Sequence, residues 1–443
     1  MKRREFNLEM MGALGAFALG RRLEVPAGFA GPTPIAPLRV DRVRLMSHFE
    51  ELAQIGKTPT GTSRVAYGDA DKAGRELVMR LMREAQLEPS IDAAANIVGR
   101  RAGRDASRKP ILFGSHIDTV PDGGNYDGVV GSLSAIEVAR TLAENDVTTR
   151  HPLQVVIWQN EEGGTVGSRA ANGELTERDL AQTTRSGKSI ADGIVFLGGD
   201  VAHLESARRV SGSIAAYLEL HIEQGAVLER EQIDIGIVEG IVGIGWWDVT
   251  VDGFANHAGT TPMDQRRDAL LAASRFVGAV ERVVRSEPGR QVGTVGRIQA
   301  FPGAPNVIPG RVVLSLEIRD LDRAKIARLF TRIQEEGLRI GRETATTFSY
   351  APTFSTEPAL TDGRIKRAIG EAAAELKLSS RSLPSGAGHD AQVMARIGPS
   401  GMIFVPSVGG ISHSPRELTT PDDIENGANV LLNVIQRLDR TLA

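Results

Sequence analysis

Apolar residues recur along the chain with two alternating patterns, one with the period of a helix and one typical of buried strands. The strand-like runs are short and end at Gly, Pro or polar residues, as strands of a parallel sheet do. The helical segments are 43–53, 72–85 and 132–145, and the strand-like segments are 111–117, 153–160 and 215–225. Because helices alternate with strands, the pattern predicts a doubly wound α/β domain that begins near residue 41.

The pattern changes near Gly243 and returns after about residue 355. Between these points the expected order of elements is β-α-β-β-α-β, which is that of the split-βαβ, or ferredoxin-like, domain. The expected strands are 246–253, 291–301, 311–321 and 346–352, and the expected helices are 264–285 and 323–342. The sequence therefore predicts a small domain, residues 244–355, inserted into a larger one formed by residues 41–243 and 356–443, which ends in a helix over 421–438.

The first 40 residues differ from the rest. Arg3 and Arg4 precede an apolar run, residues 10–20, which is too short to span a bilayer but has the length of a signal-peptide core. The paired arginines and the small residues of "AGFAG" predict a twin-arginine signal peptide over residues 1–30, followed by a Pro- and Gly-rich linker over 31–40. The protein is then expected to be exported or periplasmic. If the segment is only a basic N-terminus, the expected location is the cytoplasm.

Composition narrows the class of protein. A length of 443 residues favours more than one domain, and a net charge of -3 gives no reason to expect nucleic-acid or membrane partners. The chain has no cysteine, which excludes disulfides, a Cys nucleophile and thiolate metal ligands. Any metal ion must therefore be bound by His, Asp and Glu, a ligand set that suits Zn, Mn, Co or Ni.

Four stretches at the ends of predicted strands carry His or paired carboxylates: "SHIDT", "NEEGG", "LHIEQG" and "GISHSP". Open α/β sheets bind their ligands at strand ends. Taken singly, a His near a strand end is usually structural, and the Glu161-Glu162 pair is usually a solvated turn. However, three of only eight histidines, His116, His221 and His413, fall in these stretches. The coincidence indicates a metal site.

From about Asp41 to its C-terminus the chain resembles the M20-type metallohydrolases and, within them, the hydantoinase/carbamoylase amidases. That group includes N-carbamoyl-L-amino-acid amidohydrolase, β-ureidopropionase and allantoate amidohydrolase. The resemblance implies that the large domain is catalytic, that the inserted domain serves as a lid or for dimerisation, and that the protein is a homodimer. It rests on seven motifs in family order: "GSHIDTVPDGGNYDG", "NEEG", "ELHIEQG", "HAGTTPM", "NVIPG", "SGAGHDA" and "GISHSPRE".

The resemblance implies a centre of two divalent metal ions, Zn or Mn, with Co or Ni as alternatives. Asp127 would bridge both ions. His116 and His221 would complete one site, and Glu162 and His413 the other. Peptidase relatives have a carboxylate where this chain has His221, which favours the amidase branch.

Glu161, next to the expected ligand Glu162, would be the general base that activates water and then the acid that protonates the departing nitrogen. The alternatives for Glu161 are a second metal ligand or a bystander. Asp118 lies on the same face of an extended segment as His116. It is expected to accept the second N–H of that imidazole and so to fix its tautomer.

The remaining motifs imply substrate contacts. Arg319 would bind a substrate carboxylate bidentately, and His257 would stabilise the oxyanion in the active site of the neighbouring subunit. "NVIPG" can also be explained as turn chemistry, and "GAGHD" as a tight glycine loop. The further expected substrate residues are Gln224, Asn306, Gly388 and His389.

The chain departs from the family pattern in two places. Glu317 stands where an Asp is common before "IR", which the sequence alone suggests is neutral. The segment after "NEEGG" lacks an Arg-Phe pair that many members carry. Because this segment borders the expected metal ions, its departure leaves the substrate preference open. It does not change the expectation that metal ions are bound.

The function expected from these residues is hydrolysis of the C–N bond of a ureido or linear amide group on a small carboxylate-bearing substrate. N-carbamoyl-L-amino acids are the first expectation, with the amino acid, ammonia and carbon dioxide as products. Allantoate amidohydrolase and β-ureidopropionase are alternatives of the same class. A dipeptidase or deacylase, or a binding protein that has kept the fold without catalysis, are more distant ones.

Overall fold

The computed structural model describes residues 38–442. The expected signal peptide, residues 1–30, and most of the expected linker lie outside the described residues. Within them, no helix is both long and apolar enough to cross a membrane.

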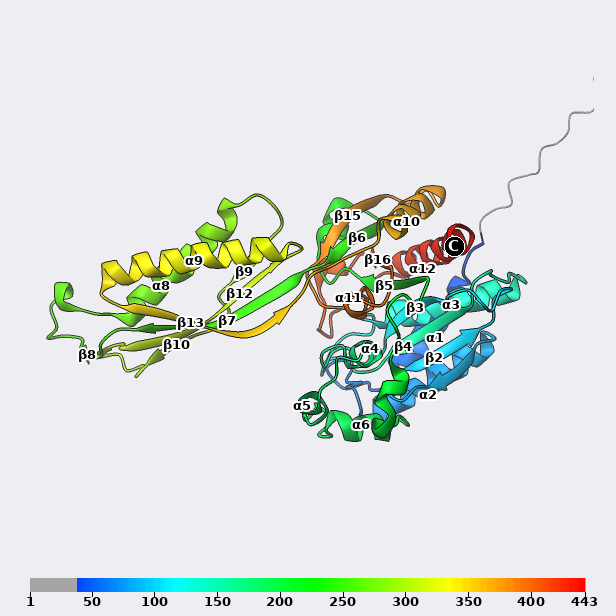
Figure 1. Cartoon of the computed structure of the whole chain (residues 1–443), viewed down its shortest axis with the longest axis horizontal. Coiled ribbons are helices and arrows are strands. Elements are labelled where there is room, and N and C mark those ends of the chain that lie inside the picture. Colours follow the sequence, from blue (N-terminus) through cyan, green and yellow to red (C-terminus); the bar gives the residue numbers. More distant parts are fainter. Residues whose placement is uncertain (1–37, 443) are drawn as a thin grey trace, which may run out of the picture. The chain divides into compact units, whose positions relative to one another are not determined.

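A mixed sheet of nine strands forms the centre of the larger part of the structure (Figure 1). The strand order is β1-β2-β4-β3-β5-β16-β6-β14, and β15 also pairs with β6. The strands are β1 (Glu88–Ile91), β2 (Ile97–Arg101), β3 (Ile111–His116), β4 (Leu153–Trp158), β5 (Ala216–Ile222), β6 (Ile235–Ile241), β14 (Ala359–Leu360), β15 (Ser380–Ser385) and β16 (Ser400–Val405).

Four neighbouring strands at the centre of this sheet, β4, β3, β5 and β16, are parallel to one another. The strands beyond them break the pattern, because β2 is antiparallel to β4 and β6 is antiparallel to β16. The edge pair β1 and β2 is joined by only a few residues, and so short a connection permits only antiparallel pairing. The α/β class is therefore confirmed, but the sheet is mixed rather than wholly parallel.

Helices cover both faces of the large sheet. One face packs in a single apolar core against five helices, and the other face packs in a second core that includes three shorter ones. Burial on both sides explains why β3 and β5 are apolar or buried along their whole length. The helices of the first face are α1 (Arg42–Ala53), α2 (Asp69–Glu84), α3 (Val129–Glu144), α10 (Gly363–Glu375) and α12 (Pro421–Thr441), and those of the second are α4 (Val166–Ala171), α7 (Val227–Glu231) and α11 (Asp390–Met394).

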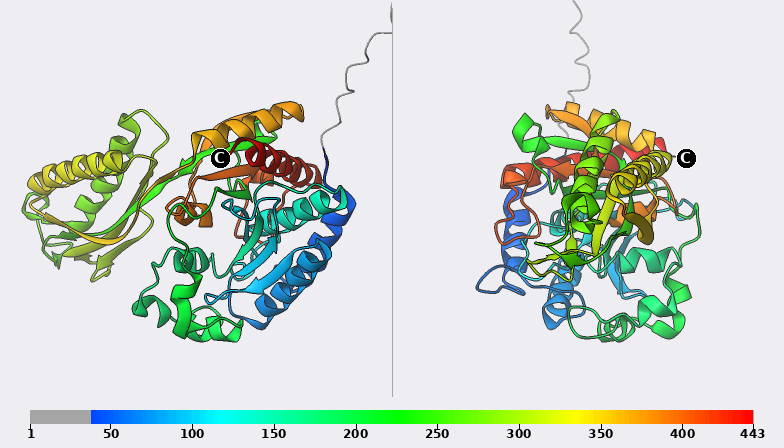
Figure 2. Two further views of the ribbon diagram at one scale, coloured as in Figure 1. Left: turned by 45° about the vertical axis from the view of Figure 1, so that its right-hand side comes forward. Right: turned by 90° about the vertical axis from the view of Figure 1, so that its left-hand side faces the viewer.

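Residues 243–356 form a second, antiparallel sheet with the order β10-β12-β7-β13, in which β9 also pairs with β12. Its two helices share one apolar core with one face of the sheet, and Figure 2 shows both on the same side. The other face carries exposed residues such as Trp246 and Phe354. The elements are β7 (Gly243–Asp252), α8 (Ala269–Ser286), β9 (Val292–Thr294), β10 (Ile298–Phe301), β12 (Arg311–Asp320), α9 (Arg323–Thr344) and β13 (Thr347–Thr356).

Two elements of residues 243–356 have bounds that differ from those expected from the sequence. The expected helix 264–285 begins only at Ala269, because the carboxylate of Asp268 accepts from the N–H groups of Leu270 and Leu271 and so caps it there. The expected strand 291–301 is divided into β9 and β10. Both pieces still pair with β12, so the predicted order of elements is retained.

Candidate metal centre

The parallel block of the large sheet brings the expected ligand residues to one edge. His116 is the last residue of β3, and His221 is the last but one of β5. The Glu161-Glu162 pair follows β4, and His413 follows β16. Since parallel strands end at the same edge of a sheet, segments that are far apart in sequence meet there.

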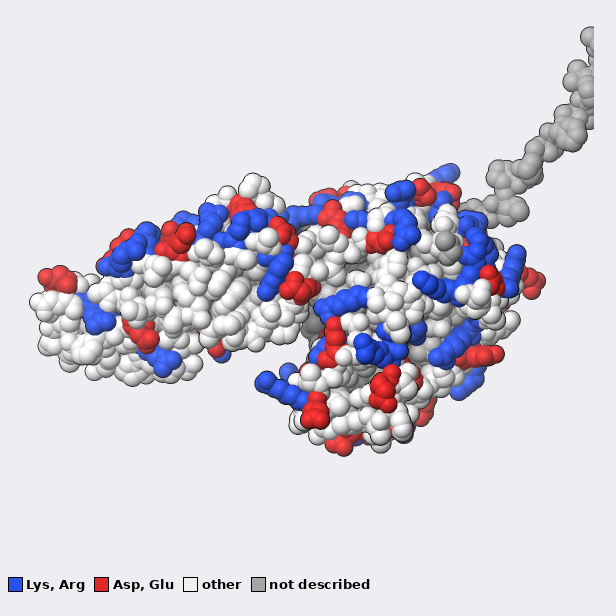
Figure 3. All heavy atoms as spheres, in the orientation of Figure 1, with Lys and Arg blue, Asp and Glu red and all other residues white. Residues whose placement is uncertain are grey.

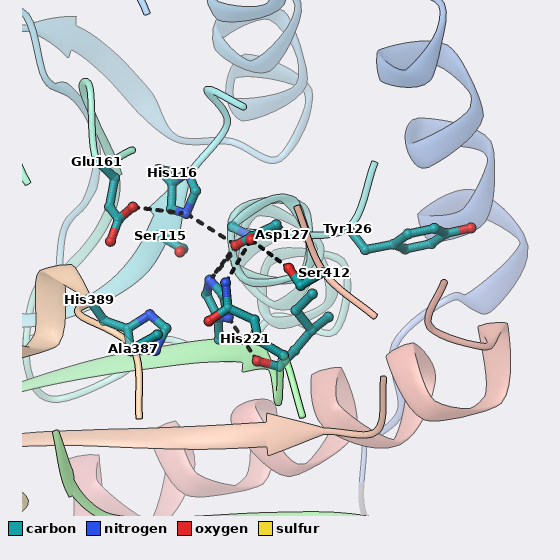
Figure 4. A network of polar contacts seen from close by, with 12 residues as sticks. Ser115, His116, Tyr126, Asp127, Glu161, His221, Ala387, His389 and Ser412 are labelled. Atoms are coloured by element: carbon teal, nitrogen blue, oxygen red, sulfur yellow. Dashed lines mark hydrogen bonds and ion pairs between the residues drawn. The ribbon is translucent and has the colours of Figure 1, made fainter. Parts of the chain in front are cut away.

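Asp127, just before α3, lies at the centre of this group (Figure 4). Its Oδ1 is 3.0 Å from His221 Nε2 and 3.7 Å from His116 Nε2. Its Oδ2 is 3.1 Å from His413 Nε2, which in turn is 3.5 Å from Glu162 Oε2. Each oxygen of this one carboxylate therefore faces its own pair of partners.

The two histidines at the strand ends are oriented by backbone carbonyls. Nδ1 of His116 lies 3.0 Å from the carbonyl oxygen of Asp118, and Nδ1 of His221 lies 2.9 Å from that of Ile222. With a proton on each Nδ1, each Nε2 is the unprotonated nitrogen, and that of His221 accepts from the backbone N–H of Gly128 at 3.2 Å. This is the tautomer that a metal-binding histidine needs.

The expected role of Asp118 needs a correction. Its backbone oxygen, rather than its carboxylate, is the acceptor for His116, because the carboxylate oxygen lies 3.6 Å from Nδ1. The carboxylate instead accepts from the backbone N–H groups of Glu161, at 3.3 Å, and Glu162, at 3.2 Å. Asp118 thus holds the turn that carries both glutamates.

Ligand atoms converge in two groups that can each hold a metal ion. His116, Asp127 and His221 form one, and Asp127, Glu162 and His413 form the other, with the atoms of each group within 4.8 Å of one another. Nitrogen and carboxylate oxygen donors suit Zn, Mn, Co or Ni. A third group contains Glu219, His221 and His389, but the carboxylate of Glu219 is already bonded.

The electrostatics of the centre favour a cation. Burial raises the pKa of the Glu162 carboxyl to about 7, and the nearby Asp127 adds to the rise. Burial likewise raises the pKa of Glu161 well above its usual range, with the carboxylates of Asp390 and Glu162 adding to it and His116 opposing it. Carboxylates crowded out of water in this way become stable as anions when a positive ion lies between them.

Adjacent glutamates diverge in the turn after β4. Glu161 Oε2 lies 3.7 Å from His116 Nε2, whereas Glu162 Oε2 faces His413. The preceding Asn160 has φ 49°, a left-handed conformation that is costly for a non-glycine residue. Gln224 and His413 have the same conformation, with φ 56° and 53°. Three residues at this centre therefore have a strained backbone conformation.

Gln224 lies beside the centre, and its contact with a substrate stays a prediction. Its Nε2 donates to Asp127 Oδ2 at 2.7 Å, and its backbone N–H donates to Ser407 Oγ at 3.0 Å. Its Oε1 is buried without a hydrogen-bond partner among the described residues. The amide therefore retains an unused acceptor next to the ligand groups.

Arg319, on β12, lines a cavity of about 420 Å³ together with Gln224 and Gly386. Its Nε and Nη2 donate to the two carboxylate oxygens of Glu317, at 2.7 and 3.0 Å, and its Nη1 donates to the carbonyl oxygen of Gly386 at 2.6 Å. Glu317 thus occupies one bidentate edge of the guanidinium, and the neutrality of Glu at this position stays a prediction.

His257 and Asn306 lie apart from the centre, at the two-stranded ladder of β8 (Asn256–His257) and β11 (Val307–Ile308). His257 is exposed, and its Nδ1 accepts from the N–H groups of Gly259 and Thr260 at 3.0 and 3.2 Å. Its proton is therefore on Nε2. Among the described residues, no hydrogen bond or ion pair links His257 or Asn306 to Asp127 or its partners.

His389 is buried beneath the centre, and Gly388 precedes it. Its Nε2 lies 2.9 Å from Ser385 Oγ, and its ring meets that of His221 edge-on, with centroids 4.5 Å apart. A side chain packed in this way supports the ring of His221. Direct contact of His389 or Gly388 with a substrate stays a prediction.

Sequence reasoning missed three polar residues that bond to the ligand segments. Ser412 lies 3.0 Å from Asp127 Oδ2, and Glu417 contacts the segments of both Asp127 and His413. Glu219 accepts from Ser115 at 2.8 Å, from Tyr217 at 3.2 Å and from the N–H of Ala391 at 2.9 Å. All three lie inside the motifs quoted above, and Glu219 is an acidic residue within an apolar strand, which was the available signal.

Comparison with known proteins shows the family of the chain. Residues 112–437 match the family described as peptidase family M20/M25/M40. The chain is 39% identical over 401 residues to an N-carbamoyl-L-amino acid amidohydrolase of Geobacillus stearothermophilus, covering 89% of this chain and 98% of that protein. It is 35% identical over 440 residues to a ureidoglycolate hydrolase of Arabidopsis thaliana (95% and 91% covered) and 36% identical over 411 residues to an allantoate amidohydrolase of Bacillus subtilis (89% and 97% covered).

A solved structure is equally similar. The crystal structure of a hydantoinase/carbamoylase family amidase from Burkholderia multivorans has a TM-score of 0.84 and 39% sequence identity, covering 92% of this chain and 100% of that one.

Proposed function

This chain belongs to peptidase family M20/M25/M40, and we propose that it hydrolyses the C–N bond of a ureido or linear amide group on a small carboxylate-bearing substrate. Its relatives at 35–39% identity are named as hydrolases of such bonds. The observation that carries the proposal is the position of Asp127, whose two oxygens each face a separate group of His and carboxylate ligands.

Two divalent ions would be held by these groups, His116 and His221 with Asp127 Oδ1 on one side, and Glu162 and His413 with Asp127 Oδ2 on the other. Zn or Mn is proposed, with Co or Ni as alternatives. When bound, such ions polarise the scissile carbonyl and lower the pKa of an attacking water.

Glu161 is the proposed general base and acid. Its side chain is largely buried, lies beside His116 and is held by the bond from its backbone N–H to Asp118. In this position Oε2 takes a proton from the attacking water and returns it to the departing nitrogen. The carboxylate of Asp118 holds the turn that carries Glu161 by accepting from the backbone N–H groups of Glu161 and Glu162.

His257 is the proposed oxyanion donor. Its Nδ1 accepts two backbone N–H groups, so the proton on Nε2 is available to a developing negative charge. Within the part of the chain that the structure describes, no hydrogen bond or ion pair links His257 to Asp127 of the same chain or to the partners of that residue. We therefore propose that His257 serves the active site of a second copy. Residues 244–355 would then form a dimerisation and substrate domain, inserted into a catalytic domain of residues 41–243 and 356–443.

Arg319 is the proposed carboxylate-binding residue, assisted by Gln224 and Asn306. Glu317 occupies the edge formed by Nε and Nη2, so a substrate carboxylate would bind through the remaining Nη protons. N-carbamoyl-L-amino acids are the first candidate substrates. Allantoate and ureidoglycolate are further candidates, because relatives of comparable identity are named for them, and N-carbamoyl-β-alanine stays an alternative.

No nucleic-acid or membrane partner is proposed. On the face shown in Figure 3, basic and acidic side chains are interspersed rather than gathered in one basic patch. Export through a twin-arginine signal in residues 1–30 is also proposed, on the evidence of Arg3, Arg4 and the apolar run that follows. Fractionation of cells and sequencing of the mature N-terminus test it.

The central experiment is an ammonia-release screen. The protein is purified, stripped of metal, reloaded separately with Zn, Mn, Co or Ni, and offered N-carbamoyl-L-amino acids, N-carbamoyl-β-alanine, allantoate and ureidoglycolate. We expect metal-dependent ammonia release from at least one of them. A protein that binds no metal and releases no ammonia from any ureido substrate would instead be a binding protein that has kept the fold.

A further inference from the structure

Glu417 lies outside both ligand groups but bonds to the segments that carry them. Its Oε1 accepts from the backbone N–H groups of Tyr126 and Asp127, at 2.9 and 3.0 Å. Its Oε2 accepts from the hydroxyl of Ser412 at 2.9 Å and from the backbone N–H of His413 at 3.2 Å. The residue is 5% exposed. One buried carboxylate thus joins two segments that are 285 or more residues apart in the chain.

The hydroxyl of Ser412 extends this link to the ligand atom itself. It lies 3.0 Å from Asp127 Oδ2 and 2.9 Å from Glu417 Oε2, so its single proton is shared between two carboxylates. The loop before Asp127 also packs closely against the carboxylate of Glu417. A Cβ at Gly124 would overlap the Glu417 carboxylate, which means that the backbone approaches it as closely as only glycine allows.

A carboxylate is the side chain that this position requires. Four donors from two segments surround its oxygens, and an ionised carboxylate offers about four acceptor sites and no proton. The amide of Gln, which is nearly the same size, would turn an NH₂ group toward one of the two pairs of donors. Those two donors would then be buried without a hydrogen-bond acceptor.

The two ligand groups depend on this link to different degrees. His116 and His221 lie in β3 and β5, which pair along their length with neighbouring strands. His413 instead lies in a loop, its side chain is 50% exposed, and its backbone has φ 53°. The direct hydrogen bond from its backbone N–H to Glu417 therefore has a larger part in placing it.

We propose that Glu417 is a positioning residue for the second ligand group: by bonding to both segments, it holds Asp127 Oδ2 and His413 Nε2 at the spacing at which they share an ion with Glu162. This inference rests on the proposed function, because it concerns the same centre. It assigns Glu417 no contact with the substrate.

The test is the Glu417→Gln variant, measured by the number of bound metal ions and by titration of the metal-free protein with Zn or Mn. We expect the first ion to bind with nearly unchanged affinity and the second about 10- to 100-fold more weakly, as is usual when an outer partner of a metal ligand is lost. The melting temperature of the metal-free variant should stay close to that of the wild type, whereas its rise on metal addition should be reduced.

Two further variants define the effect. Glu417→Asp keeps the charge but shortens the side chain by one methylene, so it cannot reach both segments, and it should behave like Glu417→Gln. Glu425→Gln changes an acid eight residues further on, which pairs with Arg42 at the surface, and it should bind both ions as the wild type does. A Glu417→Asp variant with wild-type affinity for both ions would show that charge alone matters and would overturn the proposal.

Other outcomes also decide the question. Two ions bound to Glu417→Gln with wild-type affinity, or a lower melting temperature of the metal-free variant with unchanged ion binding, would each overturn the proposal. If Glu417→Gln does not fold, Ser412→Ala removes the hydroxyl that lies between Glu417 Oε2 and Asp127 Oδ2, and leaves the bonds of Glu417 to the backbone in place. It should still weaken the second ion about tenfold, and unchanged affinity would overturn the proposal. A wild-type protein that binds no metal at all would contradict the proposed function instead.

Discussion

At the scale of single residues, neighbouring side chains of the same type have different surroundings and therefore different proposed roles. Glu161 and Glu162 are adjacent in sequence, yet one lies beside His116 and the other beside His413. Asp118 fixes this divergence by accepting the N–H groups of both. The sequence placed both glutamates in a strand-end turn. It could not show which carboxylate would hold that turn, because the bond joins segments more than 40 residues apart.

Replacement of Glu161 by Gln separates metal binding from proton transfer. The Glu161→Gln protein should keep its metal ions, because Glu161 belongs to neither ligand group, but kcat should fall about 10²- to 10⁴-fold through loss of the base. Steady-state kinetics together with metal analysis measures both quantities. Glu162→Gln is the matched comparison and should lose an ion. A Glu161→Gln protein with near wild-type kcat and full metal content would show that the base is another group.

The pair formed by Glu317 and Arg319 also leads to a prediction. In the Glu317→Gln variant the guanidinium no longer shares its charge with an internal carboxylate, so a substrate carboxylate should bind more tightly. We expect KM for a carboxylate-bearing substrate to fall about tenfold with little change in kcat. Arg319→Lys should raise KM, because a lysine has no bidentate edge. If KM rises in Glu317→Gln, the glutamate orients Arg319 instead of competing for it.

At the scale of elements, the centre depends on the point where strand β3 and helix α3 approach each other. Gly128, the residue before α3, has φ 66°, and a Cβ there would overlap the ring of His116. The chain can therefore pass from Asp127 into the helix in this way only because this residue is glycine. The pattern of apolar residues predicted both elements, but the closeness of the imidazole to the helix start comes from their packing.

Gly128→Ala should thus affect both stability and metal binding. We expect the free energy of unfolding, measured with urea on the metal-free protein, to decrease by about 1–3 kcal/mol, because a non-glycine residue is forced into a strained conformation against a buried ring. Metal content should fall as His116 is displaced. Gly278→Ala, within α8, meets only the end of the flexible Arg282 and should be neutral or slightly stabilising. Equal effects of the two substitutions would contradict this explanation.

At the scale of the whole molecule, the described residues build two larger sheets with separate cores and a two-stranded ladder, and the residues proposed for catalysis are divided among them. Glu161 and the ligand groups belong to the large sheet, whereas His257 lies beyond the second sheet without a bond to Asp127. A complete site would therefore require His257 from another copy, which is a proposal about assembly that mixed variants can test.

Two inactive variants should restore activity when mixed. Glu161→Gln and His257→Ala should each be nearly inactive alone. If His257 serves the other copy, a dimer of one of each has one intact site, so an equal mixture that exchanges subunits should recover about a quarter of the wild-type activity. Ammonia release after unfolding and refolding the mixture measures this. Failure to recover activity, with dimers confirmed by light scattering, would mean that His257 acts within its own chain or not at all.

The sequence by itself determined the type and order of the elements and the residue types that can hold a metal, because both depend on local periodicity and on motifs within single segments. The expected ligands His116, Asp127, Glu162, His221 and His413 were named from the family resemblance that these motifs carry. The i, i+2 spacing on one strand allowed Glu317 to meet Arg319, and the structure shows that the bond forms. Only the tertiary structure decided the partners of Asp118, which meets the glutamate turn, and of Glu417, which lies between the segments of Asp127 and His413. The physical reason is that these hydrogen bonds join groups brought together by sheet pairing or loop closure, and no residue spacing within one segment specifies them.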